Sequence, residues 1–120
     1  MLHLNTLTDD DARHAIKHNE FDTGIIAMAK NVLVILSQNW CSQWQYLKSD
    51  LEKHITTGEA DIHVHIFLYN RSPLFQEFMD FKEKVFVNDQ TPYMRFYRDG
   101  KLFFESNFLP LESIIRKFTS

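Results

Sequence analysis

The sequence predicts a single α/β domain in which helices flank a central mixed β-sheet. Two strand-like apolar segments, residues 31–38 and 61–69, are separated by a segment with helical spacing, and this strand–helix–strand order indicates a parallel pair of strands. Residues 92–106 contain two further strand-like runs around a tight turn, which indicates an antiparallel hairpin. One domain over residues 1–120 suits the length of the chain.

Composition excludes several classes of protein. The chain has 13 Lys and Arg against 16 Asp and Glu, a net charge of −3, so we expect no nucleic-acid partner. A single cysteine excludes an intramolecular disulfide. Residues 1–13 are acidic where a signal peptide is basic, and the most apolar stretch, 32–36, is far shorter than the roughly 20 residues that span a membrane. We therefore expect a cytoplasmic protein without a membrane partner.

Residues 1–30 are predicted to form an N-terminal helical extension. Thr8 can cap a helix whose first turn holds Asp9 to Asp11, where carboxylates oppose the helix dipole. This helix is expected to end near His18. The run GIIAMA that follows has neither a period of two nor one of 3.6, so the path of residues 19–30 stays open.

The middle of the chain reads as strand, helix and strand. The run VLVILSQ after Asn31 is continuously apolar and β-branched, which is typical of a strand buried on both faces. Residues 42–54 repeat apolar side chains at helical spacing. Residues 61–69 alternate and predict a second strand, with Ile62, Val64, Ile66 and Leu68 on one face and His63, His65, Phe67 and Tyr69 on the other.

The last third is predicted as helix, hairpin and helix. Ser72-Pro73 is a typical helix start, and Pro92 begins a strand that returns through the turn Asp99-Gly100. Pro110 opens a final helix with an apolar stripe at i, i+3, i+4 and i+7. The intervening helix carries apolar residues on more than one face, which indicates a contact surface, such as a homodimer interface, or a second packing layer: Leu74, Phe75, Phe78, Met79, Phe81 and Val85.

Two stretches resemble the thioredoxin family. NVLVILSQNWCSQW resembles the family's strand and active-site turn, in which Trp-Cys-x-x-Cys follows the strand and the first cysteine begins a helix. QTPYMRFYRDGKLFFES resembles the family's cis-proline segment and final hairpin. The resemblance covers residues 31–118 and implies a thioredoxin-like fold. It also implies a cis bond between Thr91 and Pro92 that lies against Cys41.

Three departures from the family remove parts of its dithiol chemistry. Trp44 stands where the family has its second cysteine, and Ile35 stands where many members carry a buried Asp. Phe108 aligns with a small Gly that many members keep beside the substrate groove. Since the second thiol normally releases the mixed disulfide, this chain cannot complete that step alone.

The first functional hypothesis is a monothiol exchange protein. Cys41 is the candidate nucleophile, because unpaired amides and the helix dipole at a helix N-terminus favour a thiolate. It would form a mixed disulfide with a protein, a peptide or a small thiol. By resemblance, Thr91 and Pro92 position the partner. Trp40 and Trp44 flank Cys41 and would shape the groove as an aromatic platform, and the alternative is that one or both pack on the sheet edge. The alternative for Cys41 is an inert cysteine that packs as a small hydrophobe under Trp44.

The second hypothesis is a binding or assembly module without catalysis. The groove residues suffice for it, because tryptophan is enriched at binding hot spots and the Thr91 backbone can pair with an extended peptide. Its surface would comprise Trp40, Trp44, Thr91, Pro92, Tyr93 and Phe108. An iron–sulfur site shared between two chains is a third alternative. It is disfavoured because Ser-Gln-Trp follows Cys41 where such relatives have Gly-Phe-Ser.

No metal or other cofactor is expected. His63 and His65 share one face of a strand, but the sequence suggests no third ligand for a metal. The modest basic cluster of Arg95, Arg98 and Lys101 is interpreted as a solvated face rather than a binding site.

Overall fold

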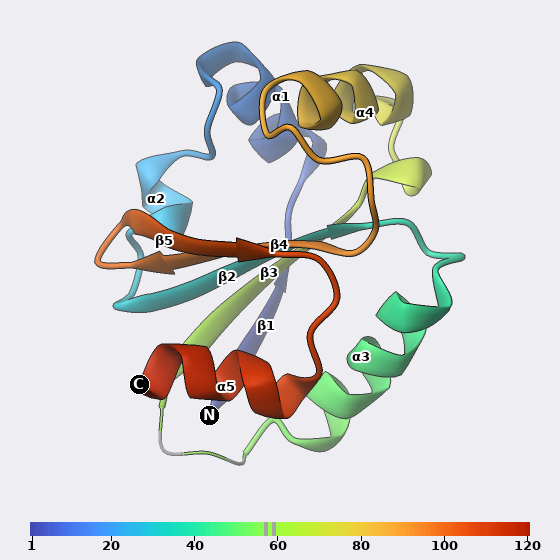
Figure 1. Ribbon diagram of the computed structural model, residues 1–120. Coiled ribbons are helices and arrows are strands. Elements are labelled where there is room, and N and C mark those ends of the chain that lie inside the picture. The colour runs from blue at the N-terminus through green and yellow to red at the C-terminus, as the bar shows by residue number, and fades with distance from the viewer. Residues whose placement is uncertain (57, 59) are drawn as a thin grey trace.

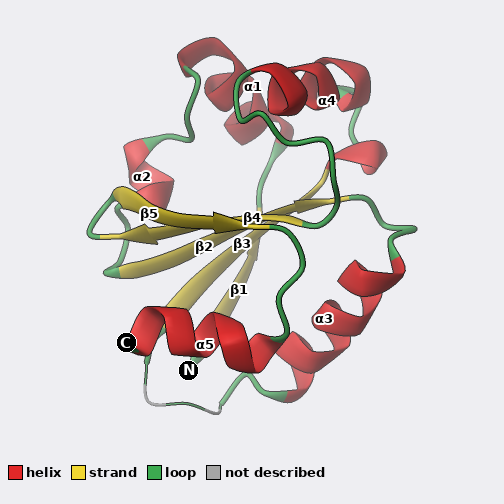
Figure 2. Ribbon diagram, in the orientation of Figure 1, coloured by secondary structure: helices red, strands yellow, loops and turns green. Residues whose placement is uncertain are grey.

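The computed structural model describes residues 1–56, 58 and 60–120, and it shows a mixed sheet between two layers of helices (Figures 1 and 2). The elements are β1 (Leu2–Thr6), α1 (Asp9–His18), α2 (Thr23–Ile26), β2 (Asn31–Ser37), α3 (Ser42–Lys53), β3 (Ile62–Leu68), the 3-10 helix η1 (Tyr69–Arg71), α4 (Phe75–Lys84), β4 (Tyr93–Arg98), β5 (Lys101–Ser106) and α5 (Leu111–Thr119). The sheet order is β1-β3-β2-β4-β5. Helices α1, α2 and α4 cover one face, and α3 and α5 cover the other (Figure 1).

The centre of the sheet confirms the predicted mixed arrangement. β2 pairs in parallel with β3 and antiparallel with β4. Its residues from Val32 to Ser37 are all buried, as a continuously apolar strand predicts. Alternate side chains of β2 enter the two cores: Val32, Val34 and Leu36 on the side of α1 and α4, and Leu33 and Ile35 on the side of α3 and α5.

The N-terminal segment differs from the prediction, because it begins with a strand and not only with helices. β1 pairs in parallel with β3, with Leu2 opposite Ile62 and Thr6 opposite Ile66, and forms one edge of the sheet. Leu2 and Leu4 alternate with the polar residues His3 and Asn5, but so short a run is a weak strand signal, and only Leu2 is fully buried. β3 is consequently an interior strand, and His65 on it is buried beside Met28.

The local signals at the element ends are largely confirmed. Thr8 and Asp11 form a capping box at the start of α1, and the Asp99-Gly100 turn joins β4 to β5 with both residues at positive φ. α4 begins at Phe75, later than Ser72-Pro73 predicts. The Ser72 hydroxyl donates to the Asp9 carboxylate at 2.6 Å, and this bond ties α1 to the start of α4.

Most of the apolar side chains of α4 pack inside the molecule. Phe78 and Phe81 are buried in the core that α1 also enters through Ala12 and Ala15. Phe75 and Met79 are partly buried against the same core. The second packing layer that the sequence allowed is therefore α1 of the same chain, and the homodimer interface stays a prediction.

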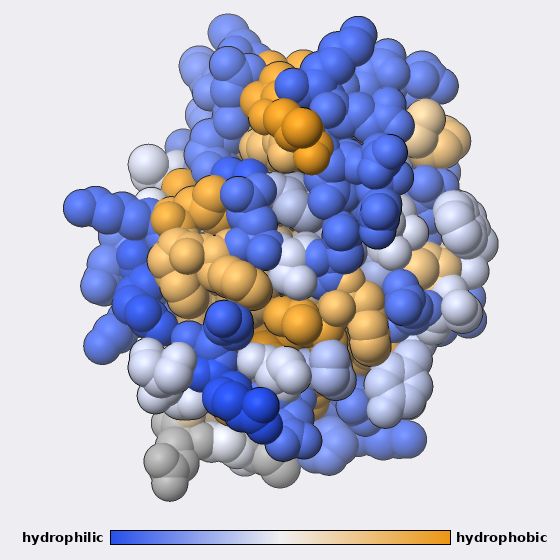
Figure 3. All heavy atoms as spheres, in the orientation of Figure 1, coloured by the Kyte–Doolittle hydropathy of each residue, from blue (hydrophilic) through white to orange (hydrophobic). Residues whose placement is uncertain are grey.

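The turn after α4 holds a residue in an unfavourable backbone conformation. Val87 has φ of 54° and is 80% exposed. Figure 3 shows an apolar patch at the top of the view, near the end of α4, and Val85 and Val87 are the exposed apolar side chains of this turn. A β-branched residue is rarely found in the left-handed region, whereas asparagine tolerates it.

We expect Val87→Asn to raise the free energy of unfolding by about 1 kcal/mol, because it relieves this strain without removing a buried contact. Urea unfolding measures the change. Val85→Asn is the matched control, since Val85 is exposed but has ordinary right-handed backbone angles, and it should give no gain. Equal stabilities for the two variants would contradict the prediction.

Candidate functional site

Cys41 lies between the end of the central strand β2 and the start of helix α3. β2 ends at Ser37, a short turn follows, and Cys41 is the N-cap residue of α3, so the unpaired amides of the first helical turn lie beside it. The residue is free of disulfide bonding and only 6% exposed. The sequence-based placement of this cysteine at a helix N-terminus is therefore confirmed.

The turn before Cys41 is held against η1 by hydrogen bonds. The backbone N–H of Asn39 donates to Asn70 Oδ1 at 2.9 Å, and Asn70 Nδ2 donates back to Asn39 Oδ1. Gln38 Nε2 donates to the Tyr69 hydroxyl at 3.4 Å, and the Cys41 N–H donates to the Gln38 carbonyl at 3.1 Å. None of these contacts is predicted by a local pattern in the sequence. Tyr69 and Asn70 follow β3 directly, and only the parallel pairing of β2 with β3 brings the two strand ends together.

The surroundings of the Cys41 sulfur favour the thiolate. Burial raises the pKa of the thiol, but hydrogen bonds from the Thr91 side chain, from the backbone N–H groups of Trp44 and Gln43, and from the Ser37 side chain together bring the pKa below its usual value. The four groups that lower it are uncharged. Helix amides and hydroxyls here take the place of the neighbouring cation that lowers the pKa of other reactive cysteines.

Thr91 reaches Cys41 from a distant part of the chain. The peptide bond between Thr91 and Pro92 is cis, which is the conformation that the resemblance implied. Thr91 is half-buried and Pro92 is buried, directly before β4 begins at Tyr93. Because β4 pairs with β2, the segment before β4 lies at the strand end from which Cys41 follows.

The two tryptophans beside Cys41 have opposite environments. Trp40 is 63% exposed, and its ring N–H donates to Gln38 Oε1 at 2.7 Å. Trp44 is 2% exposed and lies in the core with Cys41 and Leu47. Trp40 is therefore available to a partner, whereas the groove role expected for Trp44 is corrected: its ring fills the core beneath the helix.

Tyr93 is also placed away from the expected groove. Successive side chains of β4 point to opposite faces, so Met94 enters the core that contains Cys41 and Tyr93 enters the other core. The Tyr93 hydroxyl donates to the Glu105 carboxylate and accepts from Arg95 Nη1 at 2.9 Å. The expectation that Tyr93 extends the partner surface is therefore corrected.

Phe108 lies on the side of the sheet that carries Cys41. It is partly buried against the core that contains Cys41 and Trp44, and its ring meets that of Tyr46 edge-on at 6.3 Å between centroids. Tyr46 on α3 is largely exposed. The sequence analysis named Phe108 but not Tyr46.

Solved structures resemble this chain over its full length. The oxidised thioredoxin of Plasmodium falciparum has a TM-score of 0.60 and 15% identity, with all of each chain covered. Thioredoxin f from spinach chloroplast has a TM-score of 0.65 and 12% identity, covering 98% of this chain and 91% of its own. The chain has the thioredoxin fold. Thioredoxin f2 of Chlamydomonas reinhardtii matches similarly, with a TM-score of 0.61, 13% identity and coverage of 97% and 94%. No protein-family model matches the sequence, and no curated protein matches it significantly.

Within the thioredoxin fold, the three departures have structural counterparts. Trp44 occupies core volume rather than the surface. Ile35 is fully buried in the same core, so the interior behind the cysteine is apolar at the position where many family members have a carboxylate. Phe108, which the sequence resemblance aligns with a small residue, packs its ring partly against the same core. Trp44, Ile35 and Phe108 therefore fill the core around Cys41 with apolar side chains.

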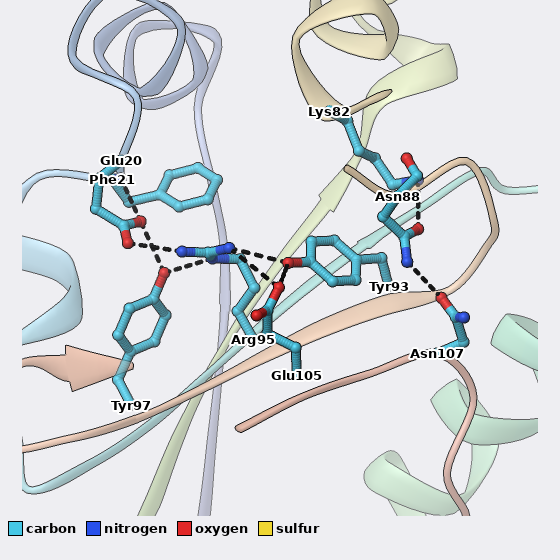
Figure 4. A network of polar contacts seen from close by, with 9 residues as sticks. All are labelled: Glu20, Phe21, Lys82, Asn88, Tyr93, Arg95, Tyr97, Glu105 and Asn107. Atoms are coloured by element: carbon cyan, nitrogen blue, oxygen red, sulfur yellow. Dashed lines mark hydrogen bonds and ion pairs between the residues drawn. The ribbon is translucent and has the colours of Figure 1, made fainter. Parts of the chain in front are cut away.

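Arg95 is not part of a solvated basic cluster, which corrects the sequence-based interpretation. It is 6% exposed and donates to Glu20 Oε2 and to the Tyr97 hydroxyl, both at 2.7 Å (Figure 4). Its guanidinium also lies 3.9 Å from the centroid of the Phe86 ring. This network lies on the face of the sheet opposite Cys41 and anchors the segment after α1 to β4.

The described part of the chain has neither a group of three possible metal ligands nor a helix that could cross a membrane. Residues 1–56, 58 and 60–120 contain no cluster of three His, Cys, Asp or Glu side chains arranged to hold a metal ion. His63 stacks on His3, with 4.2 Å between ring centroids, and His65 contacts Met28. Over the same residues, every helix is too short or too polar to cross a membrane.

Proposed function

We propose that this thioredoxin-fold protein performs thiol–disulfide exchange with one thiol, Cys41, through a mixed disulfide. The observation that carries the proposal is the place of Cys41 as the N-cap residue of α3, where the Thr91 and Ser37 side chains and the amides of Gln43 and Trp44 lower the pKa of its thiol. An inert buried cysteine has a raised pKa, whereas these contacts lower it.

The exchange needs two external partners. The Cys41 thiolate attacks one sulfur of a partner disulfide, so a Cys41–partner S–S bond forms and the partner's second sulfur leaves as a thiolate that takes up a proton. A second thiol, on a protein or a small molecule, then attacks the Cys41–partner bond. Its sulfur becomes joined to the partner, and Cys41 returns as a thiolate. No second cysteine of this chain takes part.

The partner would be recognised beside Cys41. Trp40, the residue before Cys41, offers an exposed ring, and the Thr91 side chain reaches the sulfur from the other segment, with Pro92 next to Thr91 in the chain. A protein or peptide disulfide fits this arrangement, and a small disulfide needs only the sulfur itself. The proposal places the protein in a reducing compartment such as the cytoplasm, where external thiols are available.

We expect alkylation of Cys41 in the native protein to show a pH midpoint below the value of about 8.5 for a free cysteine, because the thiolate reacts and its pKa is lowered. Below the midpoint the rate falls with pH, and above it the rate levels off. Intact mass measures the labelling, and the chain has one cysteine, so the signal is unambiguous.

Unfolded protein in urea provides the matched control, since the same cysteine then lacks the hydrogen bonds of the fold. Cys41→Ser should take up no label and should form no mixed disulfide with oxidised glutathione. A native midpoint at or above that of the unfolded chain would overturn the proposal, and so would failure to form the mixed disulfide.

A binding module without catalysis is the second candidate, and the contrast between Trp40 and Cys41 favours it. The tryptophan is exposed while the neighbouring sulfur is almost buried, so a partner can contact the ring without reaching the thiol. Tyr46 and Phe108 add aromatic surface on the same side of the sheet. Under this candidate, partner affinity survives in Cys41→Ser and is lost in Trp40→Ala.

A further inference from the structure

Lys82 is a buried cation whose hydrogen bonds all go to one segment. It lies in α4, only 1% exposed, and Figure 4 shows its side chain directed at Asn88. The ammonium donates to the Asn88 carbonyl at 3.0 Å, to Asn88 Oδ1 at 2.9 Å and to the Gln90 carbonyl at 2.7 Å. These three bonds use all three ammonium protons, and they end at Gln90, the residue before Thr91.

Asn88 extends this contact to a second segment beside Cys41. Its Oδ1 also accepts from the Gln90 N–H at 3.0 Å, which closes a turn around the ammonium. Its Nδ2 donates to Asn107 Oδ1 at 2.9 Å (Figure 4). Asn107 precedes Phe108, which packs against the Cys41 core. Lys82 therefore binds directly to Gln90, the residue before Thr91, and is linked to Asn107 only through Asn88.

Packing alone does not account for a lysine at this position. Burial lowers the pKa of Lys82 to about 8, partly offset by the nearby carboxylates of Glu83 and Asp89. The ammonium is also close to two aromatic rings, 5.9 Å from the Tyr69 centroid and 5.6 Å from that of Tyr93. Methionine would fill a similar volume without desolvating a charge. What methionine cannot do is hold two carbonyls and an amide oxygen at one point.

We propose that Lys82 is a positioning residue for the Cys41 site: it holds residues 88–90 so that the Thr91 side chain stays against the Cys41 sulfur. The inference rests on the proposed thiol chemistry. Lys82 acts on the sulfur only through Thr91. Its effect on Cys41 reactivity should therefore disappear when the Thr91 hydroxyl is absent.

We expect Lys82→Met to raise the pH midpoint of Cys41 alkylation by about half a unit, which corresponds to about threefold slower labelling well below the midpoint. Thr91→Val should raise the midpoint at least as far. The double variant should match Thr91→Val alone, because one interaction cannot be lost twice. Lys84→Met is the matched control, since Lys84 lies on the same helix but is exposed, and it should leave the midpoint unchanged.

Asn88→Ala is a second variant with an intact core, because Asn88 is only half-buried and Lys82 keeps its two carbonyl acceptors. It should raise the midpoint by a smaller amount. If Lys82 only stabilises the fold, Lys82→Met will lower the free energy of unfolding but leave the pH midpoint of Cys41 alkylation at the wild-type value. That result would overturn the inference. The inference would also be overturned if the midpoint of the double variant shifted by the sum of the shifts that Lys82→Met and Thr91→Val cause separately.

The two proposals fail in different ways. A wild-type midpoint equal to that of the unfolded chain would remove the thiol function, and the inference about Lys82 with it. A low wild-type midpoint that Lys82→Met and Asn88→Ala do not change would leave the thiol function standing and overturn the role of Lys82 alone.

Discussion

We expect Trp44→Cys, which restores the spacing of the family's two cysteines, to lower the free energy of unfolding by about 4 kcal/mol. The ring of Trp44 is buried in the core with Cys41 and Leu47, and cysteine leaves most of that volume empty. Since a domain of this size is stable by roughly 5–15 kcal/mol, this loss would remove about a quarter to four fifths of its stability. Urea unfolding under reducing conditions measures the change without a disulfide to Cys41.

Trp40→Cys is the matched control. It removes the same kind of side chain from an exposed position just before Cys41, so we expect a change within about 0.5 kcal/mol. Equal losses in the two variants would show that Trp44 does not fill the core as the structure describes. The expected contrast also explains why regaining disulfide reduction in this scaffold requires more than a second cysteine: the residues around position 44 must first be repacked.

Glu20→Ala should lower the free energy of unfolding by about 3 kcal/mol, because it leaves the buried Arg95 guanidinium without its main counter-charge. The Glu20 carboxylate also accepts from the Tyr97 hydroxyl at 2.7 Å and from the Phe21 N–H at 2.8 Å. Glu105 remains 3.7 Å from Arg95 Nη1, which places the expected loss at the lower end for a broken buried pair. Chemical denaturation measures the change.

The pair formed by Glu112 and Arg116 provides a matched control with the same separation. Both ion pairs have an N–O distance of 2.7 Å, but Arg116 and Glu112 are largely exposed on α5. Glu112→Ala should therefore cost at most about 0.5 kcal/mol. A loss for Glu20→Ala no larger than that for Glu112→Ala would mean that burial does not set the strength of the Arg95 network.

The sequence already contained the evidence that Trp44 belongs to the core. Trp44 shares a helical stripe with Leu47 and Leu51, and both of those residues are buried, so its spacing already assigned it to the core. Its position three residues after Cys41 and the enrichment of tryptophan at binding hot spots instead suggested a groove role for it. Thr91 entered through the resemblance alone, because nothing local in the sequence relates it to a cysteine 50 positions earlier.

Ser37, Tyr69 and Lys82 could not be recognised in the same way. Ser37 is the last residue of a strand and looks like an ordinary strand end, and Lys82 sits in a helix whose other lysine is solvated. Their roles come from partners that the chain brings near only after folding: the Cys41 sulfur for Ser37 and the turn at residues 88–90 for Lys82.

The sequence by itself determined the order of most elements, the Asp99-Gly100 turn and the position of Cys41 at the start of a helix. Those features depend on periodicity, caps and turn residues, which act between neighbours in the chain. Only the tertiary structure decided that β1 forms a sheet edge and that Arg95 and Lys82 are buried. Those outcomes depend on contacts between segments far apart in sequence, such as Glu20 and Arg95, which are 75 positions apart, and no local pattern encodes such a pairing.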